Sequence, residues 1–594
     1  MREFFAFDVI NLLKRLLGIF LSLLLSFGVI GGAIPAPGPD AVETSPYFMA
    51  GDGAFLRAPA ENAFWSVGFA KKVITPPDVL TNPGAYYMAG YANNKRPAEV
   101  MDDTFVRTVY IDDNSGRGGV LFAVIDAIGL SNKEVLEIRQ SVWPFVTANH
   151  IKSVNVLCTH NHAGIDTQGL WGNPYLLQTG RNEQYNAYLK DLVAQSMKEA
   201  FQRRVKGNLY WGEITPQEDI FNDNRDPYVY EKSLTRLRFT PAGTPGDRSD
   251  DLYICALNAH PEMMAVGNTS VSADYPAYMG RYIAEHTGGT VNPDGTVTGG
   301  ADFVLFNGAI GALINGKGLG DVFSIIEDKV NPFELSEDGT RTNIEAIAAK
   351  MRRILGVTGE PLSDYLLSLT LADLDADGRL NETQKNRTRK AFTVAFGRTV
   401  GRYICEIDGA GEYPVAPFVN IRFEPVILPV DNYILTLGAK AGLVNVNAYK
   451  AGDFGLDAVI TTEGGILELG GSLRFVLAPG ALAPELAMGG YLPAQASANG
   501  FEMDGTTAFG IIDPGRLASG GGIKSKNLVL GLVNDEIGYI IPENDFYVHR
   551  FLPYVAQEND RLGRGHYEET VSAGPKTAGI LLEKWQTVYD ATHQ

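Results

Sequence analysis

Short apolar runs alternate with amphipathic segments along this chain from about Trp65 onward. Residues 104–111 predict a strand, and the unbroken apolar run at 120–125 is typical of a strand that is buried on both faces. Residues 131–148 place apolar side chains at helical spacing and begin with Ser-Asn-Lys-Glu, a capping-box sequence. The run at 151–158 predicts the next strand, so these segments predict a β-α-β unit.

The alternation continues to the C-terminus, with a change of character in the middle. Residues 318–400 are more charged and richer in helix formers, which predicts a largely helical insertion. After about residue 415 the chain is rich in glycine and in strand-forming residues. Helices are also expected at 185–204 and 577–590, and strands at 252–258, 418–423, 433–437, 467–469 and 473–477. This order predicts an α/β fold class in which mixed β-sheets are flanked by helices.

The N-terminal segment has the pattern of an export signal or a membrane anchor. Arg2, Lys14 and Arg15 precede a Leu-rich run at 16–34 that contains no charge, and a Pro-rich stretch follows at 35–39. A basic flank before an apolar run is typical of a secretory signal or a signal anchor, and this run is near the lower length limit for crossing a bilayer. A buried core helix is the alternative. We therefore expect an exported protein, either secreted or anchored in a membrane.

Composition and charge narrow the organisation further. We expect the export segment at 1–35, a linker rich in Pro, Gly and Ala at 36–62, and one folded unit at 63–594. The formal net charge of -19 argues against nucleic acid as a partner, because phosphate binding needs clustered Lys and Arg. The three cysteines allow at most one disulfide, and the apolar runs around Cys158 and Cys255 favour a role as small buried side chains.

Polar residues that can bind a metal follow several of the apolar strands. His160 and His162 stand two positions apart just after the strand at 151–158, in a chain with only 8 histidines. Residues i and i+2 of a strand point to the same face, so both imidazoles can converge on one metal ion or one substrate. A pair of polar residues at a strand-to-loop exit is the alternative. Asp126 and His260 also follow apolar strands, and open sheets bind ligands at the carboxyl ends of their strands.

A second candidate metal site lies inside the helical insertion. Asp373, Asp375 and Asp377 alternate as in a calcium-binding loop, and Gly378 permits the sharp turn that such a loop requires. The twelfth position, where a bidentate glutamate belongs, is Gln384. We expect a structural calcium site here, with a solvated acidic turn as the alternative.

Taken together, these segments resemble the neutral/alkaline ceramidase family, zinc amidases that cleave the N-acyl bond of sphingolipids. The resemblance covers most of residues 65–590 and implies the catalytic domain of that family over 63–594, without the immunoglobulin-like module that family members commonly carry after it. The matching segments are Trp-Ser-Val-Gly at 65–68, Met-Ala-Gly-Tyr at 88–91, Thr-His-Asn-His at 159–162, Asn-Arg at 224–225, His-Pro at 260–261, Ser-Ala-Asp-Tyr-Pro at 272–276, Gly-Tyr at 538–539 with Pro542, and His-Tyr-Glu at 566–568.

The resemblance implies one zinc ion held by two histidines, a glutamate and a tyrosine. His160 matches the first histidine ligand, His260 the second, and Tyr539 the tyrosine. His162 matches a histidine that lies beside the metal and contacts the substrate or its oxyanion. A zinc ion with an open position lowers the pKa of bound water to about 7 and polarises an amide carbonyl. The implied reaction is hydrolysis of an N-acyl amide by attack of zinc-bound water.

The resemblance also implies residues around the reaction centre. Tyr567 matches a tyrosine that hydrogen-bonds there, and Arg225 matches an arginine that faces the substrate. Asp126 and Asp274 are candidates to accept the second N–H of a zinc-bound histidine, since such histidines usually donate it to a carboxylate or a carbonyl. For Asp274, a turn cap ahead of the following helix is the alternative.

Two positions depart from the family pattern. Ala481 stands where the family has its glutamate ligand, and alanine cannot bind a metal. If 481–485 is the first turn of a helix, Glu485 shares a face with Ala481 and is the candidate fourth ligand. Ile314 stands where the family has a serine close to the scissile amide, and isoleucine can neither attack nor donate a proton.

Three interpretations follow. The first is a zinc hydrolase of N-acyl amides, with ceramide or a related N-acyl lipid as substrate and a membrane surface as partner; it predicts zinc and a rate that is lost on chelation. The second is a catalytically degenerate relative that binds a lipid or a metal without turnover. The third is an extracellular scaffold in which the histidines satisfy buried polar groups. In the first two, the apolar run at 16–34 is a candidate membrane tether.

Overall fold

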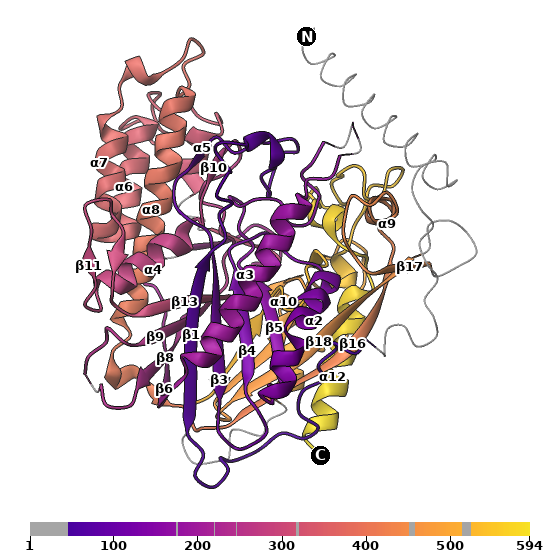
Figure 1. Cartoon of the computed structure of the whole chain (residues 1–594). Coiled ribbons are helices and arrows are strands. Elements are labelled where there is room, and N and C mark those ends of the chain that lie inside the picture. Colours follow the sequence, from indigo (N-terminus) through magenta and orange to yellow (C-terminus); the bar gives the residue numbers. More distant parts are fainter. Residues whose placement is uncertain are drawn as a thin grey trace.

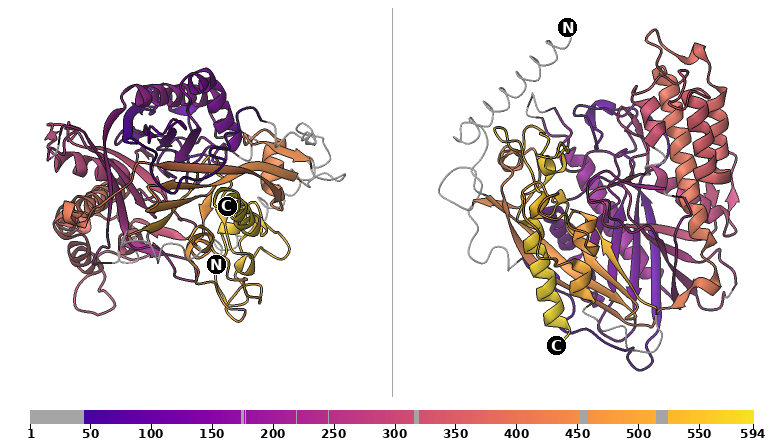
Figure 2. Two further views of the ribbon diagram at one scale, coloured as in Figure 1. Left: turned by 90° about the horizontal axis from the view of Figure 1, so that it is seen from below. Right: turned by 180° about the vertical axis from the view of Figure 1, so that it is seen from behind.

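The structure, a computed structural model, describes residues 45–594 except 174, 175, 177, 219, 245, 316–319, 451–457 and 514–523. Two β-sheets pack face to face, and helices cover the outer face of each sheet (Figures 1 and 2). The α/β class with mixed sheets flanked by helices, predicted from the sequence, is confirmed.

The larger sheet has nine strands in the order β13-β9-β8-β6-β1-β3-β4-β5, with β15 beside β6. The pairs β13–β9 and β4–β5 are parallel and the other neighbours are antiparallel. Its strands are β1 (Trp65–Val73), β3 (Phe105–Asp112), β4 (Val120–Ile125), β5 (Ser153–Cys158), β6 (Val205–Ile214), β8 (Leu234–Pro241), β9 (Leu252–Leu257), β13 (Asp302–Asn307) and β15 (Tyr413–Pro414).

The second sheet has five strands in the order β16-β18-β19-β21, with β17 beside β18. They are β16 (Val419–Val430), β17 (Ala448–Lys450), β18 (Ala458–Leu469), β19 (Leu473–Leu477) and β21 (Lys526–Leu530). Two-stranded pairs complete the set: β10 (Ser270–Val271) with β2 (Glu99–Val100), β11 (Thr290–Val291) with β12 (Val297–Thr298), β14 (Leu313–Asn315) with β7 (Phe221–Asp223), and β20 (Ala481–Leu482) with β22 (Tyr539–Ile540).

Helices lie in three groups around these sheets (Figure 2). The first group, α2 (Asn132–Ala148) and α3 (Glu183–Gln202), covers β1, β3, β4 and β5. The second packs against β9 and β13. It contains α4 (Tyr275–Glu285), α5 (Gly320–Ile326), α6 (Asn343–Leu355), α7 (Glu360–Ser368) and α8 (Glu382–Glu406). The third lies on the second sheet and contains α10 (Pro484–Met488), α11 (Ala508–Ile512) and α12 (Thr577–Thr592). The predicted helical insertion is therefore confirmed, as the bundle α5–α8 at one end of the molecule (Figure 1).

Strand β4 shows how the apolar pattern produces these layers. Side chains alternate between the two faces of a strand, so Phe122 packs toward the second sheet while Leu121 and Ile125 pack toward α2 and α3. All six residues of β4 are buried, as its unbroken apolar run predicts. Ser131 caps the N-terminus of α2. Its hydroxyl accepts the N–H of Glu134, and the Glu134 carboxylate accepts the Ser131 N–H. The predicted β-α-β unit and its capping box are both present.

One predicted strand is a helix. Residues 433–437 belong to α9 (Tyr433–Lys440). The side chain of Asn432 accepts the N–H groups of Ile434 and Leu435, so it caps the first turn of this helix. Local capping outweighs the apolar and β-branched composition that suggested a strand.

Residues 45–62, predicted as linker, contain no helix or strand but are attached to the second sheet. The Asp52 carboxylate accepts the N–H of Ile421 and pairs with Lys152 at 2.9 Å. Phe55 is buried in the core beneath α12. The export or anchor segment predicted at 1–35 lies outside the described residues, so it stays a prediction. Among the residues that the structure does describe, no helix is long and apolar enough to cross a membrane.

The two edge strands of the larger sheet, β13 and β5, are joined at their C-terminal ends. The segment 531–534, which continues β21, lies between them: the Gly531 N–H donates to the Asn307 carbonyl at the end of β13, and Asn534 exchanges two hydrogen bonds with Val156 in β5. The Asn307 side chain donates directly to the Thr159 carbonyl at 2.8 Å. The loops that follow β5 and β9 are thereby brought to one place.

We expect Asn534→Ala to lower the apparent free energy of unfolding by about 2 kcal/mol or more, because buried backbone groups of β5 lose their partner. Asn534 adopts a left-handed φ of 62°, so the exposed Asn62, with φ of 61°, provides the matched control Asn62→Ala. Urea unfolding of both variants measures the difference. Equal stability of the two would contradict the joining role of 531–534.

Candidate metal centre

Three histidines from two loops meet beyond the C-terminal ends of β5 and β9. His160 and His162 follow β5, and His260 follows β9. The N–H of His162 donates to the Pro261 carbonyl at 3.0 Å, which ties the two loops together. His160 has a left-handed φ of 65°, a conformation that is uncommon for a residue with a side chain and that turns the chain sharply after the strand.

Buried polar side chains hold both loops in place. The Asn161 side chain donates to the Ser272 carbonyl at 2.7 Å and accepts the Ala163 N–H at 3.0 Å. The Asp274 carboxylate accepts the N–H groups of Met263, Met264 and Tyr275, so it caps α4 and organises the loop after His260. Of the two roles considered for Asp274, the turn cap is therefore the one the structure shows.

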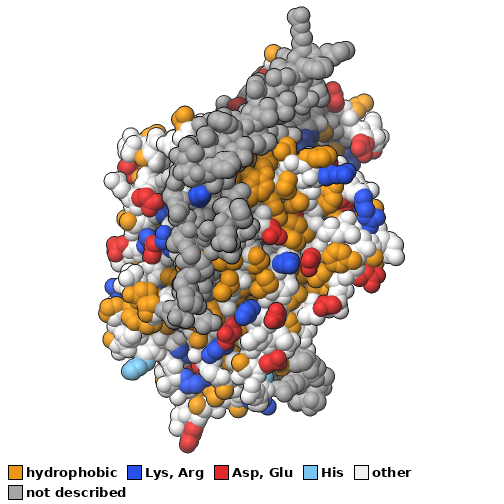
Figure 3. Space-filling model, turned by 90° about the vertical axis from the view of Figure 1, so that its right-hand side faces the viewer, with side chains coloured by type: hydrophobic (Ala, Val, Ile, Leu, Met, Phe, Trp, Pro, Cys, Tyr) orange, Lys and Arg blue, Asp and Glu red, His pale blue; other side chains and the backbone are white. Residues whose placement is uncertain are grey.

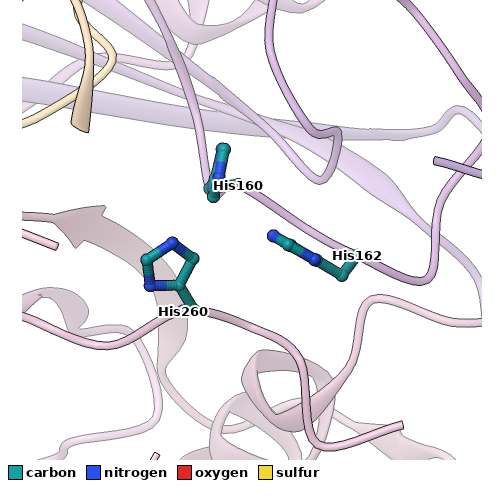
Figure 4. Close-up of side chains that lie close together, drawn as sticks. All are labelled: His160, His162 and His260. Carbon is teal, nitrogen blue, oxygen red and sulfur yellow. The ribbon is translucent and has the colours of Figure 1, made fainter. Parts of the chain in front are cut away.

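The imidazoles converge on one space (Figure 4). Each histidine offers a ring nitrogen, and these three atoms all lie within 4.8 Å of one another. The ring centroids are 5.0 Å apart for His160 and His162, 4.9 Å for His160 and His260, and 5.6 Å for His162 and His260. All three side chains are buried. The i, i+2 spacing after a strand thus does bring His160 and His162 together.

The protonation state of these rings suits a metal. The Nδ1 atom of His160 lies 2.8 Å from the Ile128 carbonyl, which fixes the proton on Nδ1 and leaves the Nε2 lone pair available. Burial, with a smaller contribution from His260, lowers the pKa of His160 to about 3, and burial lowers the pKa of His162 well below its usual value. Three buried imidazoles in this arrangement fit a zinc ion, which commonly takes three protein nitrogens and keeps one open position.

Two tyrosines border the histidines. Tyr539 lies in β22, beside Ala481 in β20, and its ring centroid is 6.5 Å from that of His260. The hydroxyl oxygens of Tyr539 and Tyr567 are 3.3 Å apart. Burial raises the pKa of both tyrosines above the usual value, so both hydroxyls are protonated at neutral pH and can donate hydrogen bonds.

Glu262, which was not predicted as a site residue from the sequence, also lies beside the histidines. The Glu262 carboxylate accepts the Tyr91 hydroxyl at 2.8 Å, and its Oε2 atom is 3.9 Å from Nδ1 of His162. Burial raises the pKa of Glu262 to about 8. The available signal was its position two residues after His260, in a loop already singled out for metal-capable side chains.

These side chains border a cavity of about 990 Å³. Polar residues in its lining include His160, His162, Glu262, Tyr539 and Tyr567. The remainder is bordered largely by apolar side chains from β16, α9, β17 and β18 and from the loop between α9 and β17: Val430, Leu435, Ala439, Val444, Val446, Ala448, Ala458 and Ile460. Figure 3 shows the side of the molecule on which α9 and β17 lie in Figure 1. Hydrophobic side chains gather in the upper part of this face. An elongated, partly apolar ligand suits such a space.

A scan against protein-family models and a search of curated proteins found no match. Solved structures do match. The neutral ceramidase from Pseudomonas aeruginosa superposes with a TM-score of 0.56 over 90% of this chain and 75% of that chain, at 14% identity. A ceramidase complexed with C2 superposes with a TM-score of 0.57 over 89% of this chain and 75% of that chain, at 13% identity.

This chain has a neutral-ceramidase-like fold. The fold that the motif resemblance implied is therefore confirmed, and at this level of identity the match speaks for the fold alone.

Asp126 and Arg225 are both engaged in ion pairs. The Asp126 carboxylate pairs with Arg107 at 2.7 Å and accepts the Phe105 N–H, so its oxygens already serve the sheet. The Arg225 guanidinium is bonded to Asp545, Glu568 and Glu569. Neither Asp126 nor Arg225 is among the described residues that line the cavity.

The suggested substitution of Glu485 for the missing glutamate ligand rested on a shared helical turn, which the structure does not contain. Ala481 lies in β20, and α10 begins only at Pro484. Ala481 lines the cavity, whereas Glu485 is not among the described residues that do so. Burial raises the pKa of the Glu485 carboxyl to about 8. Ile314 lies in β14, paired with Asn222, and its side chain is outside the described part of the structure.

The predicted calcium loop forms a turn whose carboxylates bond within it. Gly378 has the left-handed φ of 75° that the motif requires. Asp373 accepts the N–H of Thr370 and the side chain of Gln384, and Asp375 accepts the Asp377 N–H. Calcium binding here stays a prediction.

A second buried group contains Asp545, Asp560 and His566. Its carboxylates already pair with arginines, Asp545 with Arg225 at 3.0 Å and Asp560 with Arg564 at 2.7 Å. The His566 Nδ1 atom is 2.8 Å from Glu569. These contacts make it an ion-pair network, and the three-histidine group is the stronger metal candidate.

We expect Gly90→Ala to displace His162 and to reduce metal binding. An added Cβ would lie 2.8 Å from the His162 Cβ, closer than two carbons normally approach. Gly116 also has a positive φ, but a Cβ there would meet nothing within 4 Å, so Gly116→Ala controls for backbone strain. Zinc content after dialysis and the thermal midpoint of the two variants measure the effect. Equal zinc retention would contradict it.

Glu485→Gln is expected to flatten the pH dependence of stability. Its pKa of about 8 in the folded protein exceeds the unfolded value of about 4.3. The stability that this proton contributes is therefore full below about pH 4.3 and is lost as pH rises toward 8.

Urea unfolding of metal-free protein at about pH 5.5 and about pH 7.5 should show a steeper loss in the wild type, by up to about 1.4 kcal/mol per pH unit. Glu502→Gln, at an exposed glutamate, controls for the change of charge. Identical slopes in the wild type and Glu485→Gln would show that Glu485 is not held protonated.

Proposed function

We propose that this protein is a zinc-dependent hydrolase of N-acyl amide bonds, with ceramide or a related N-acyl lipid as its substrate. The convergence of three buried histidines carries this proposal. Two of them, His160 and His162, border a cavity that also has an apolar wall, within a neutral-ceramidase-like fold. A zinc-dependent hydrolase needs metal ligands at the scissile bond, and a lipid substrate needs apolar lining for its chain.

His160 and His260 would hold the zinc ion, with Tyr539 next to them. A bound zinc ion supplies a Lewis acid for the amide carbonyl and lowers the pKa of water. The Nδ1–H of His160, held by the Ile128 carbonyl, orients its ring for this purpose.

The protein's own groups would position the substrate and move protons. The Tyr567 hydroxyl, protonated at neutral pH, borders the cavity and can donate to the oxygen on which negative charge develops. The apolar wall formed by α9, β17 and β18 would hold the acyl chain, and each buried methylene contributes about 0.8 kcal/mol to binding. A cavity of about 990 Å³ is at the upper end of the range for small-molecule sites, which leaves room for a head group as well as a chain.

One observation favours a second candidate function. Ala481 lines the cavity at the position where the resembling family has its glutamate ligand. A protein that binds an N-acyl lipid or a metal without turnover is therefore the alternative, and a rate measurement separates the two.

The test is zinc content and hydrolysis in the same preparation. We expect about one zinc ion per chain, and release of fatty acid from N-acyl amides that stops on chelation and returns when zinc is added. His160→Ala should lose both zinc and rate. Tyr567→Phe should keep its zinc and lower kcat by about 100-fold, because one donor to the developing charge is removed.

His286→Ala serves as the control for removing a histidine. His286 stacks on Tyr282 at 3.7 Å and bonds to its carbonyl, and it is not among the described residues that line the cavity. Zinc without any hydrolysis would favour the binding protein, and absence of zinc from the wild type would overturn the proposal.

A further inference from the structure

His162 is the least satisfied of the three histidines. Both of its ring nitrogens are buried, and neither has a hydrogen-bond partner. A buried polar atom without a partner costs about 1–3 kcal/mol, so an arrangement of this kind usually has a function. One ring nitrogen of His162 belongs to the same group of metal-capable atoms as those of His160 and His260.

The surroundings hold the His162 ring in that position. The Tyr91 ring packs edge-on against it with centroids 5.1 Å apart. Gly90 allows the chain to pass so closely that a Cβ there would collide with His162. These contacts come from the loop at 88–91, which is separate from the two loops that contain the histidines.

Glu262 lies beside the His162 ring. Its Oε2 atom, held by the Tyr91 hydroxyl at 2.8 Å, is 3.9 Å from the His162 Nδ1 atom. The Tyr91–Glu262 pair therefore packs beside the Nδ1 atom of His162 and limits the positions that the ring can take. Glu262 also has a buried Oε1 atom without a hydrogen-bond partner.

No carboxylate near Tyr539 belongs to this group among the described residues. Asp535 and Glu536 border the cavity, but the group of metal-capable atoms does not include them. Ala481 also borders the cavity and has no ligand atom, and Glu485 is not among the described residues that line it. The group of metal-capable atoms consists of three imidazoles.

We infer that His162 is a third metal ligand in this protein, and that Glu262 and Tyr91 position it. This inference rests on the proposed zinc site and specifies its ligands. His162 thereby has a different role from that of a substrate contact, and an imidazole takes the place of the missing glutamate. The ligands would then be three ring nitrogens, because Glu262 does not belong to the group of metal-capable atoms that the histidines form.

Zinc affinity tests the inference directly. Competition with a chromogenic chelator is measured for the purified full-length protein and its variants. His162→Ala should weaken zinc binding by at least about 100-fold, as His260→Ala does, and Glu262→Gln should weaken it by about 10- to 100-fold. Glu485→Gln, the same substitution at another buried glutamate, should bind zinc within about twofold of the wild type. Thermal midpoints of the metal-free variants show whether each is folded.

X-ray absorption of the zinc-loaded protein provides an independent readout. The wild type should show three imidazole ligands and Glu262→Gln should bind less zinc with the same ligands. The inference would be overturned if His162→Ala bound zinc with wild-type affinity. It would also be overturned if zinc had only two imidazole ligands in a hydrolytically active wild type. Either result would leave the proposed function standing. A wild type without zinc would overturn both.

Discussion

Closure of the larger sheet at one end is the constraint on which the site depends. Strands β5 and β13 are opposite edges of that sheet, and the segment 531–534 together with the Asn307 side chain joins them where both strands end. Without this junction the loop after β5 and the loop after β9 would start far apart in the sheet order. With it, His160 and His260 stand with ring centroids 4.9 Å apart. The helices and the second sheet then enclose the space in front of them.

The chemistry of the site follows from its burial. Desolvation keeps the imidazoles of His160 and His162 neutral and keeps the Tyr567 hydroxyl protonated, because each charged form would leave water without a full set of partners. Neutral imidazoles are ligands, and protonated phenols are donors. The same burial makes the unpartnered nitrogens of His162 costly in the metal-free protein, and a bound cation would relieve that cost.

Much of the fold could be predicted from local pattern, and much of the site could not. The run at 120–125 and the capping box at Ser131 gave β4 and α2 to within a residue, because alternation and capping act locally. The helix at 433–440 was missed because the side chain of Asn432 decides it. The partners of Arg225 come from residues more than three hundred positions away, so its burial in an ion-pair network had no local signal. Glu262 had a local signal in its position two residues after His260, but its contacts with Tyr91 and His162, on other loops, could not be predicted from it.

The central claim is that three histidines from two loops form one metal centre. Anomalous diffraction at the zinc absorption edge, from crystals of the zinc-loaded protein, tests it most directly. The account predicts a single strong peak about 2.0–2.1 Å from one ring nitrogen of each of His160, His162 and His260. A peak at the Asp545–Asp560–His566 group, or no peak between the three histidines, would contradict it.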